Sequence, residues 1–443
     1  MLFCLYSLAD LALILGTDFA FYILKEVINL EKILRLQCVK CGATYAEDEV
    51  QYVCPDCGIE GILDVIYDYE LIGRELTKEY LLNNNDRSMN RYFPILPVEL
   101  MDSFEPLQVG YTPLYKVKML REQLELDNLY IKDDSRNPTL SFKDRASSVG
   151  IAKAKELERD IITAASTGNA ASSISGFAAC AGIKSIIFVP KTAPEAKVTQ
   201  LLVFGSTVFL VDGTYDEAFE LCFKAAEKFG WYNRSCAINP YLVEGKKTVA
   251  FEIIEQLDFK VPDYVVMSVG DGCSISGAYK GFVEFQKLGL IDKTPKMIGI
   301  QAAKSNPVTR ACNKNTYEFE YRKPETVADS ISVGIPRNGI KALNAIKDSG
   351  GYMIDVSDVE IVETIKYLAS NSGIFGEPAG VTGFAGVRKL KRLGLINRED
   401  LIVTVVTGSG LKDLKTAQLA TPEAHNVSTD INDLVELMRK IQK

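Results

Sequence analysis

Lys143 follows an Asn-Pro turn and lies where a helix is expected to begin. The segment Asn137–Arg145 leads from an apolar stretch into this helix, which we expect to start near Ser141. The positive end of a helix disfavours a nearby ammonium group, so the pKa of the lysine falls and its neutral amine can attack a carbonyl. Lys143 is therefore a candidate for Schiff-base chemistry, although a solvated lysine after such a turn is common and the pattern is weak by itself.

A glycine loop follows the apolar stretch Tyr264–Val269 and opens an expected helix over Ile275–Lys287. Backbone N–H groups and the helix dipole converge on an anion at such a junction. The loop has neither the Gly-Lys-Ser/Thr of a Walker A sequence nor the third glycine of a dinucleotide-binding loop. It predicts a phosphate site of another kind, with a plain strand-to-helix turn as the alternative. Its residues are Gly270, Asp271, Gly272, Cys273 and Ser274.

Two more loops follow expected strands. Ser166, Thr167 and Asn169 lie in the first loop, which opens a helix and offers N–H groups and hydroxyls to a carboxylate. The second loop runs from Thr407 to Lys412 and follows the last expected strand. One amine and several anion sites at strand ends suit a phosphorylated aldehyde together with an amino acid, and pyridoxal phosphate is such an aldehyde.

Four cysteines form two Cys-x-x-Cys pairs, each followed by a glycine: Cys38, Cys41, Cys54 and Cys57. Four thiolates at this spacing fit tetrahedral zinc, and because they fill every coordination position, the metal would be structural. A pair of disulfides and a rubredoxin-type iron centre are the alternatives. The other six cysteines are scattered through apolar sequence, which favours a reducing compartment and hence the cytoplasm.

The overall composition excludes several classes of function. An apolar content of 47% and a charged content of 24% over 443 residues are typical of a folded chain of two or three domains. The net charge of −8 provides no positive field for a phosphate backbone, so we expect no nucleic-acid partner. His425 is the only histidine, so a catalytic triad or a histidine metal site would depend on that one late residue.

Residues 1–24 are strongly apolar but contain Asp10 and Asp18. Each carboxylate would cost about 2.5–3.5 kcal/mol at the centre of a bilayer, and no signal-peptide cleavage site is evident. We therefore expect no membrane span. The N-terminal extension, residues 1–35, is then either an extra docked helix or sequence upstream of the natural start, and we favour the second because recognisable pattern begins near Leu36.

The elements that must position these residues alternate between strands and helices from Tyr111 onward. Short apolar runs followed by amphipathic stretches predict parallel sheets with helices on both faces, an α/β fold. The expected strands include 128–132, 160–165, 185–189, 207–211, 264–269, 296–301 and 400–406, and the expected helices include 146–157, 215–229 and 246–257.

Over residues 36–418 the chain resembles the threonine synthases, within the tryptophan-synthase-like class of pyridoxal-phosphate enzymes. The matching pieces are the cysteine pairs, Gly110–Leu114, Asn137–Arg145, Ser166–Asn169, Asn239–Tyr241 with Glu244 and Gly245, Val269–Ile275, Gly373–Pro378 and Thr407–Asp413. The resemblance implies two open parallel-sheet domains of the tryptophan-synthase-β-like, fold type II architecture, preceded by a small zinc ribbon. The expected parts are the extension (1–35), the zinc ribbon (36–66), a lead-in segment (67–109), a large cofactor-binding domain (110–150 and 244–425), a small α/β domain (151–243) and a C-terminal helix (426–443).

The resemblance also implies roles for single residues. Lys143 would form the Schiff base with the cofactor and remove the proton from the substrate's α-carbon. Asn169 would bond the cofactor's 3-hydroxyl, and Thr407 would face its ring nitrogen. Ser166, Thr167 and Asn169 would bind the substrate carboxylate, and the N–H groups of Gly270, Asp271, Gly272, Cys273 and Ser274 would bind the cofactor phosphate.

Some positions depart from the family, and they concern the substrate more than the cofactor. Ala237 and Leu242 stand where the family commonly has a serine and an arginine that bind the phosphate of phosphohomoserine, and neither side chain can do so. The cations that could replace the arginine are Lys191, Lys197, Lys246 and Arg234. The remaining departures are Ala170 for threonine, Asp271 and Ser274 for asparagine, and Ser409 for histidine; the Asp271 carboxylate must point away from a phosphate.

The resemblance implies a threonine synthase activity, the conversion of O-phospho-L-homoserine and water to L-threonine and phosphate. An ammonia-lyase acting on threonine or serine, or another β- or γ-elimination or replacement enzyme of this fold, is the alternative, because the loss of phosphate contacts suits a small hydroxy amino acid. We expect a homodimeric cytoplasmic enzyme with a small amino-acid substrate and no membrane attachment.

Overall fold

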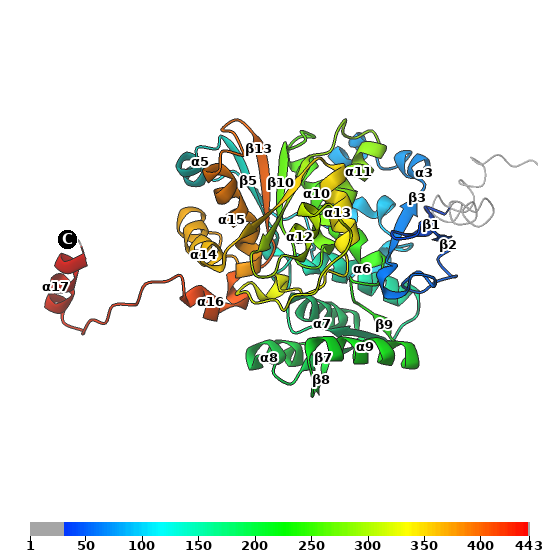
Figure 1. Ribbon diagram of the computed structural model, residues 1–443, viewed down its shortest axis with the longest axis horizontal. Coiled ribbons are helices and arrows are strands. Elements are labelled where there is room, and N and C mark those ends of the chain that lie inside the picture. The colour runs from blue at the N-terminus through cyan, green and yellow to red at the C-terminus, as the bar shows by residue number, and fades with distance from the viewer. Residues whose placement is uncertain (1–30, 442–443) are drawn as a thin grey trace, which may run out of the picture.

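A computed structural model describes residues 31–441 (Figure 1). It contains a six-stranded sheet, a four-stranded sheet and a three-stranded ribbon, with helices around both larger sheets. These parallel sheets confirm the expected α/β fold. The apolar stretch 1–24 lies outside the described residues. Between residues 31 and 441, no helix is long and apolar enough to cross a bilayer.

The large sheet has the strand order β12-β11-β10-β13-β5-β4, and only the short edge strand β4 runs antiparallel to its neighbour. The central strands β10 (Tyr264–Ser268) and β13 (Leu401–Val406) are almost continuously buried and rich in valine, as strands covered on both faces require. The other strands are β4 (Leu114–Tyr115), β5 (Asn128–Asp133), β11 (Lys296–Ala302) and β12 (Tyr352–Val356).

Three helices beside the large sheet pack unusually closely. Helix α10 (Tyr241–Gln256) contacts both α6 (Lys143–Glu156) and α11 (Cys273–Lys287). A Cβ atom at Gly245 would lie 2.0 Å from the carbonyl oxygen of Arg145, and one at Gly277 would lie 2.9 Å from Cβ of Lys246. The glycines therefore fix the spacing of the three helices. The remaining helices of this part are α5 (Lys118–Leu124), α12 (Pro307–Asn313), α13 (Gly339–Asp348), α14 (Asp358–Ser372), α15 (Pro378–Arg392) and α16 (Leu414–Gln418).

A fully paired ionic cluster lies between α6, α10 and β5, and its side chains are completely buried. Arg145 donates from Nε to Oδ2 of Asp134 at 2.7 Å and from Nη2 to Oε2 of Glu252 at 2.9 Å. Nζ of Lys132 lies 2.6 Å from Oε2 of Glu252. Burial by itself would raise the pKa of Glu252, but the charges of Arg145 and Lys132 lower it to about 2. We call these four residues the paired cluster.

The small sheet has four parallel strands in the order β8-β7-β6-β9. Its strands are β6 (Ile161–Ala165), β7 (Lys184–Pro190), β8 (Thr207–Val211) and β9 (Tyr232–Asn233), and its helices are α7 (Asn169–Ala181), α8 (Glu195–Val203) and α9 (Tyr215–Phe229). Helix α9 begins with a capping box, in which Thr214 and Glu217 satisfy each other's backbone N–H groups.

The N-terminal ribbon is an antiparallel sheet of β1 (Ile33–Cys38), β2 (Thr44–Tyr45) and β3 (Leu63–Tyr67). Charged contacts connect it to the helices of the large sheet. Asp64 lies 3.0 Å from Nζ of Lys280 and 2.8 Å from Nζ of Lys341, and the hydroxyl of Tyr67 donates to Oε2 of Glu244 at 2.9 Å. The ribbon is thus attached to the same helices that surround Lys143.

Short helices follow the ribbon: α3 (Tyr69–Gly73), α4 (Lys78–Asn83) and the 3-10 segments Met89–Ile95 and Met101–Ser103. They are part of the core, since Arg91 is buried and donates to Oε1 of Glu255 on α10 at 2.7 Å. At the other end of the chain, α17 (Ile431–Ile441) has no buried residue and lies away from the body in Figure 1. The domain boundaries stated above stay a prediction.

Candidate active site

Lys143 is the first residue of α6, so the helix begins slightly later than the expected Ser141. The strand β13 ends beside it, because the N–H of Phe142 donates to the carbonyl of Thr407 at 2.9 Å. Burial lowers the pKa of Lys143 to about 8; the charge of Lys246 acts in the same direction and that of Glu377 opposes it. A lysine with this pKa has an appreciable neutral fraction near neutral pH, which a nucleophilic amine requires.

Asn169 and Glu377 form a buried pair at the same end of the sheet. Nδ2 of Asn169 donates to Oε1 of Glu377 at 2.6 Å. The loop after β13 presses against both residues, since a Cβ atom at Gly408 would lie 2.4 Å from Oε1 of Glu377 and 3.2 Å from Nδ2 of Asn169. Glu377 was not predicted to have a role, although its Gly-Glu-Pro motif is part of the family resemblance and was the signal that could have identified it.

The loop of residues 270–274 joins β10 to α11, as expected. Gly272 has a φ of 96°, and a Cβ there would lie 2.7 Å from the carbonyl oxygen of Asn338. A glycine is therefore required here because the loop packs against the start of α13. Close approach by a ligand would be a second reason for the same residue. Oδ1 of Asp271 accepts from the backbone N–H of Arg337 at 3.3 Å, so this carboxylate is directed toward residue 337. The first N–H groups of α11 have no partner within the helix.

A pocket opens at the N-terminus of α7. Thr167–Asn169 line it, and Oγ of Ser166 accepts from the N–H of Gly168 at 3.2 Å just before the helix. Lys197 and Lys412 line the same pocket. The N–H groups at the start of a helix of this length suit a carboxylate.

The four cations considered as substitutes for an arginine at 242 have different surroundings. Lys191 is exposed at the end of β7. Lys197 lines the pocket and forms an ion pair with Asp329. Lys246 and Arg234, by contrast, are buried close to Lys143, whose pKa both of them lower. The structure thus separates one exposed, one paired and two buried cations.

Cys236 lies beside Arg234, whose Nη1 is 3.8 Å from its Sγ. Burial would raise the pKa of its thiol, but Lys246, Arg234 and Lys143 together lower it. The Sγ atom of Cys273, at the start of α11, donates to the carbonyl oxygen of Cys236 at 3.5 Å. This region therefore brings Lys143 and the loop of residues 270–274 together.

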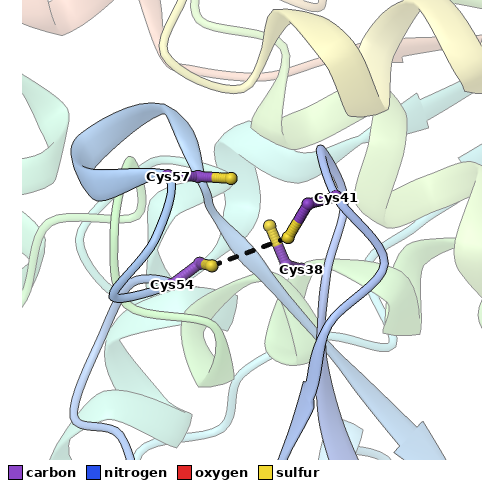
Figure 2. A group of neighbouring side chains, drawn as sticks. All are labelled: Cys38, Cys41, Cys54 and Cys57. Atoms are coloured by element: carbon purple, nitrogen blue, oxygen red, sulfur yellow. Dashed lines mark hydrogen bonds between the residues drawn. The ribbon is translucent and has the colours of Figure 1, made fainter.

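The sulfur atoms of Cys38, Cys41, Cys54 and Cys57 lie within 4.8 Å of one another, and Figure 2 shows them directed at a common centre. Both pairs fold alike, since the N–H of Gly42 donates to the carbonyl of Cys38 at 3.0 Å and that of Gly58 to the carbonyl of Cys54 at 2.9 Å. All four cysteines are free rather than disulfide-bonded. Four converging sulfur ligands without an open position fit a structural zinc ion.

Three comparisons relate this chain to known proteins. Residues 106–408 match the family model described as "Pyridoxal-phosphate dependent enzyme". The threonine synthase of Methanocaldococcus jannaschii is 40% identical over 91% of this chain and 99% of its own length, and that of Methanosarcina acetivorans is 42% identical over 90% and 98%. Among solved structures, the processed form of threonine deaminase isoform 2 from Solanum lycopersicum is 23% identical, with a TM-score of 0.61 over 70% of this chain and 88% of that chain.

The fold and the lysine site together define a fold type II pyridoxal-phosphate enzyme. Within this class, the two archaeal relatives cover nearly the whole chain at 40% identity or more. The chain belongs to the threonine synthase family of pyridoxal-phosphate dependent enzymes.

The residues present fit pyridoxal phosphate. The amine of Lys143 has the lowered pKa that a Schiff base requires, and the first N–H groups of α11 suit a phosphate. In the described part of the chain, two buried oxygens near the loop lack a hydrogen-bond partner: the Ser276 hydroxyl in the first turn of α11 and the Asn338 amide. Such unpaired polar atoms are expected where a polar ligand binds.

Proposed function

We propose that the chain is a threonine synthase that converts O-phospho-L-homoserine and water to L-threonine and phosphate. The buried amine of Lys143 beside an anion-binding loop supports this function most directly. The 40% identity to the Methanocaldococcus jannaschii threonine synthase over 91% of the chain supports the substrate.

The cofactor would be held by residues from both sheets. Lys143 would bind its aldehyde, Asn169 would bond its 3-hydroxyl and Thr407 would face its ring nitrogen. The N–H groups of Gly270, Asp271, Gly272, Cys273 and Ser274 would bind its phosphate. Pyridoxal phosphate, when bound, withdraws electrons from the α-carbon of the amino acid.

The chain's own residues then move protons and hold the substrate. Ser166, Thr167 and the start of α7 bind the substrate carboxylate and so orient the α-carbon toward Lys143. The Lys143 amine removes the α-proton, and its lowered pKa makes it a competent base near neutral pH. A second proton then leaves the β-carbon and phosphate leaves the γ-carbon. Protonation of the γ-carbon, addition of water at the β-carbon and return of a proton to the α-carbon complete the conversion, so both protons that were removed are given back.

An ammonia-lyase acting on threonine or serine is the second candidate. Leu242 and Ala237 are buried and apolar where the family commonly binds the substrate's phosphate. An active site without those contacts would suit a small hydroxy amino acid.

A product assay with phosphohomoserine, threonine, serine and phosphoserine separates the two activities. We expect equal amounts of threonine and inorganic phosphate from phosphohomoserine. Formation of 2-oxobutanoate from threonine, without phosphate release from phosphohomoserine, would instead identify the ammonia-lyase.

We also propose that the enzyme is a homodimer in the cytoplasm and binds no nucleic acid. The net charge of −8 supports the absence of a nucleic-acid partner, and the free cysteines support the cytoplasm, whereas the dimer rests on the family resemblance alone. Size-exclusion chromatography with light scattering measures the mass in solution; a monomer at micromolar concentration contradicts the dimer.

A further inference from the structure

Two cations next to Lys143 have no carboxylate partner. The side chains of Lys246 and Arg234 are buried, with 2% and 3% of their residue surfaces exposed. Neither forms an ion pair with an aspartate or glutamate of the described chain, and Nε of Arg234 has no hydrogen-bond partner there. A buried charge without a partner is costly, because the protein does not replace the water it has lost. An anionic ligand at this position would remove that cost.

The nearby acidic groups have other partners. Asp271 accepts from the N–H of Arg337, and Glu377 accepts from Asn169. Nη1 of Arg234 reaches only Sγ of Cys236, at 3.8 Å, and its Nη2 reaches the hydroxyl of Ser147 at 3.4 Å. The hydroxyl of Ser147 carries no charge, and the single thiol of Cys236 compensates at most one of the two cations.

The pocket lysines differ in this respect. Lys197 pairs with Asp329. Lys412 donates to Oγ of Ser172 at 3.0 Å, and burial lowers its pKa although the charge of Glu377 opposes that shift. Both lysines are therefore at least partly compensated. The excess positive charge lies deeper, around Lys143, Lys246 and Arg234.

Helix geometry relates Lys246 to the missing arginine. Leu242 and Lys246 are one turn apart on α10 and share a face of the helix. Helical side chains lean toward the N-terminus, so a long side chain at 246 covers the turn that contains residue 242. Consistent with this direction, Lys246 interacts with Cys236, which precedes the helix. The Leu242 side chain instead fills the space beside Gly150 of α6.

We propose that Lys246 and Arg234 bind the phosphate group of the substrate, in place of the arginine that is absent at position 242. This inference rests on the proposed threonine synthase function. An ammonium group one turn along the helix, together with a guanidinium from the segment before it, supplies the charge-assisted hydrogen bonds that a dianionic leaving group needs.

The first test compares the purified holoenzyme with its Lys246→Gln and Arg234→Gln variants on phosphohomoserine. We expect kcat/KM to fall about tenfold to a hundredfold in each variant, the loss expected for one charge-assisted hydrogen bond. Lys191→Gln is the matched control, because Lys191 is exposed and should leave kcat/KM unchanged. Unchanged kcat/KM in both site variants, or a loss only in Lys197→Gln, overturns the proposal.

The second test does not depend on turnover. Inorganic phosphate should raise the unfolding temperature of the wild-type holoenzyme above that in chloride of equal ionic strength, and this increase should disappear in Lys246→Gln. The visible absorbance and the cofactor content of the variant should stay as in the wild type. Loss of the cofactor from the variant would show that Lys246 binds the cofactor's phosphate instead, and would overturn the proposal.

A rescue variant tests whether a cation at position 242 can replace the one at position 246. Adding Leu242→Arg to Lys246→Gln should recover kcat/KM for phosphohomoserine at least in part, whereas Leu242→Met in the same background should not. If wild type releases no phosphate from phosphohomoserine, the proposed function fails. In that case, stabilisation by inorganic phosphate that depends on Lys246 still supports an anion site, and its absence removes both proposals.

Discussion

Helices α6 and α10 each contribute to two groups of buried charges that differ in one respect. In the paired cluster, Arg145 and Glu252 contact each other, and Asp134 and Lys132 complete the neutralisation. Around the active site, the charge of Lys246 on α10 lowers the pKa of Lys143 on α6, and no ion pair joins either lysine to a carboxylate in the described chain. Charges that serve the fold are neutralised by the chain itself, whereas charges that serve a ligand are left for the ligand to neutralise.

Two consecutive lysines of α10 show the same contrast. Nζ of Lys247 lies 2.6 Å from Oε2 of Glu244 and 2.8 Å from Oε2 of Glu284, and all three side chains are almost completely buried. Lys246 is equally buried and has no such pair. Side-chain burial by itself therefore does not distinguish a structural lysine from a functional one, but the presence of a counter-ion does.

The largest effect is expected at Lys143. The Lys143→Ala variant should lose all measurable turnover and the visible absorbance near 410 nm, because only a primary amine can form the Schiff base. Its circular dichroism should match that of the wild type. Turnover at the wild-type rate in this variant would contradict the assignment of Lys143 to catalysis.

Within the paired cluster, the effect should fall on stability. Replacing Glu252 by Gln leaves Arg145 and Lys132 buried with a single counter-ion, which should lower the free energy of unfolding by about 3–5 kcal/mol. Urea denaturation measures the difference. Glu122→Gln, at the exposed pair with Lys118, is the control and should change stability by less than about 1 kcal/mol. Similar losses in both variants would mean that the paired cluster contributes no more to stability than an exposed ion pair does.

The same carboxylate gives the paired cluster a pH dependence. Its pKa is about 2 in the folded protein and lies below the value of 4.5 that an unperturbed glutamate has. A lowered pKa contributes stability above pH 4.5, and this contribution is lost as the pH falls from about 4.5 toward 2. Denaturation curves between pH 6 and pH 3 should show a weaker decline for Glu252→Gln than for the wild type; parallel declines would contradict this origin.

The four cysteines are a group of negative charges, so they test whether unpaired anions, like unpaired cations, mark a ligand site. Four thiolates in one place require a cation, so removal of zinc by a chelator should lower the unfolding temperature by several degrees. Replacing Cys38 and Cys41 by serine should have the same effect while the kcat of the folded fraction stays near that of the wild type. Metal analysis should find about one zinc ion per chain in protein purified without chelator, and none would argue against the site.

The smallest effect is expected for Lys246, whose replacement should not destabilise the protein. Lys246→Met in phosphate-free buffer should leave the free energy of unfolding unchanged or raise it by up to about 1 kcal/mol, because an unpaired buried charge is removed. Lys247→Met should lower it by several kcal/mol, since Glu244 and Glu284 lose their partner. Equal destabilisation by both substitutions would mean that Lys246 has a counter-ion in the folded chain after all.

Local patterns predicted many elements correctly. The expected strand 207–211 and helix 215–229 coincide with β8 and α9, because the strand is a continuous apolar run and the helix has a strong capping box. Helix α10, however, begins at Tyr241 rather than at residue 246, since the apolar Tyr-Leu-Val after a proline has no helical signal of its own. Strand β12 was not among the strands named from the sequence, because it is only five residues long and Asp355 interrupts its apolar pattern.

The sequence predicted the loops of the candidate site, but not which charged side chains would lie near Lys143. Lys143 and the loop of residues 270–274 were identified because each lies at a strand-to-helix junction with a recognisable local pattern. The contact of Glu377 with Asn169 and the position of Lys246 beside Lys143 depend on how helices from distant segments pack. No local pattern contains that information. The turn of Asp271 toward Arg337 likewise depends on the distant segment before α13.

The glycines between α6, α10 and α11 have a consequence for how such an enzyme changes its substrate range. Gly245 and Gly277 set the distances between the helices through backbone contact, since a Cβ atom would lie 2.0 Å from the carbonyl oxygen of Arg145 at the first and 3.2 Å from that of Val243 at the second. A binding residue can therefore be exchanged for another one turn away while the scaffold stays as it is. Directed evolution toward a different amino acid would begin with a library at positions 242 and 246, and would keep these two glycines constant.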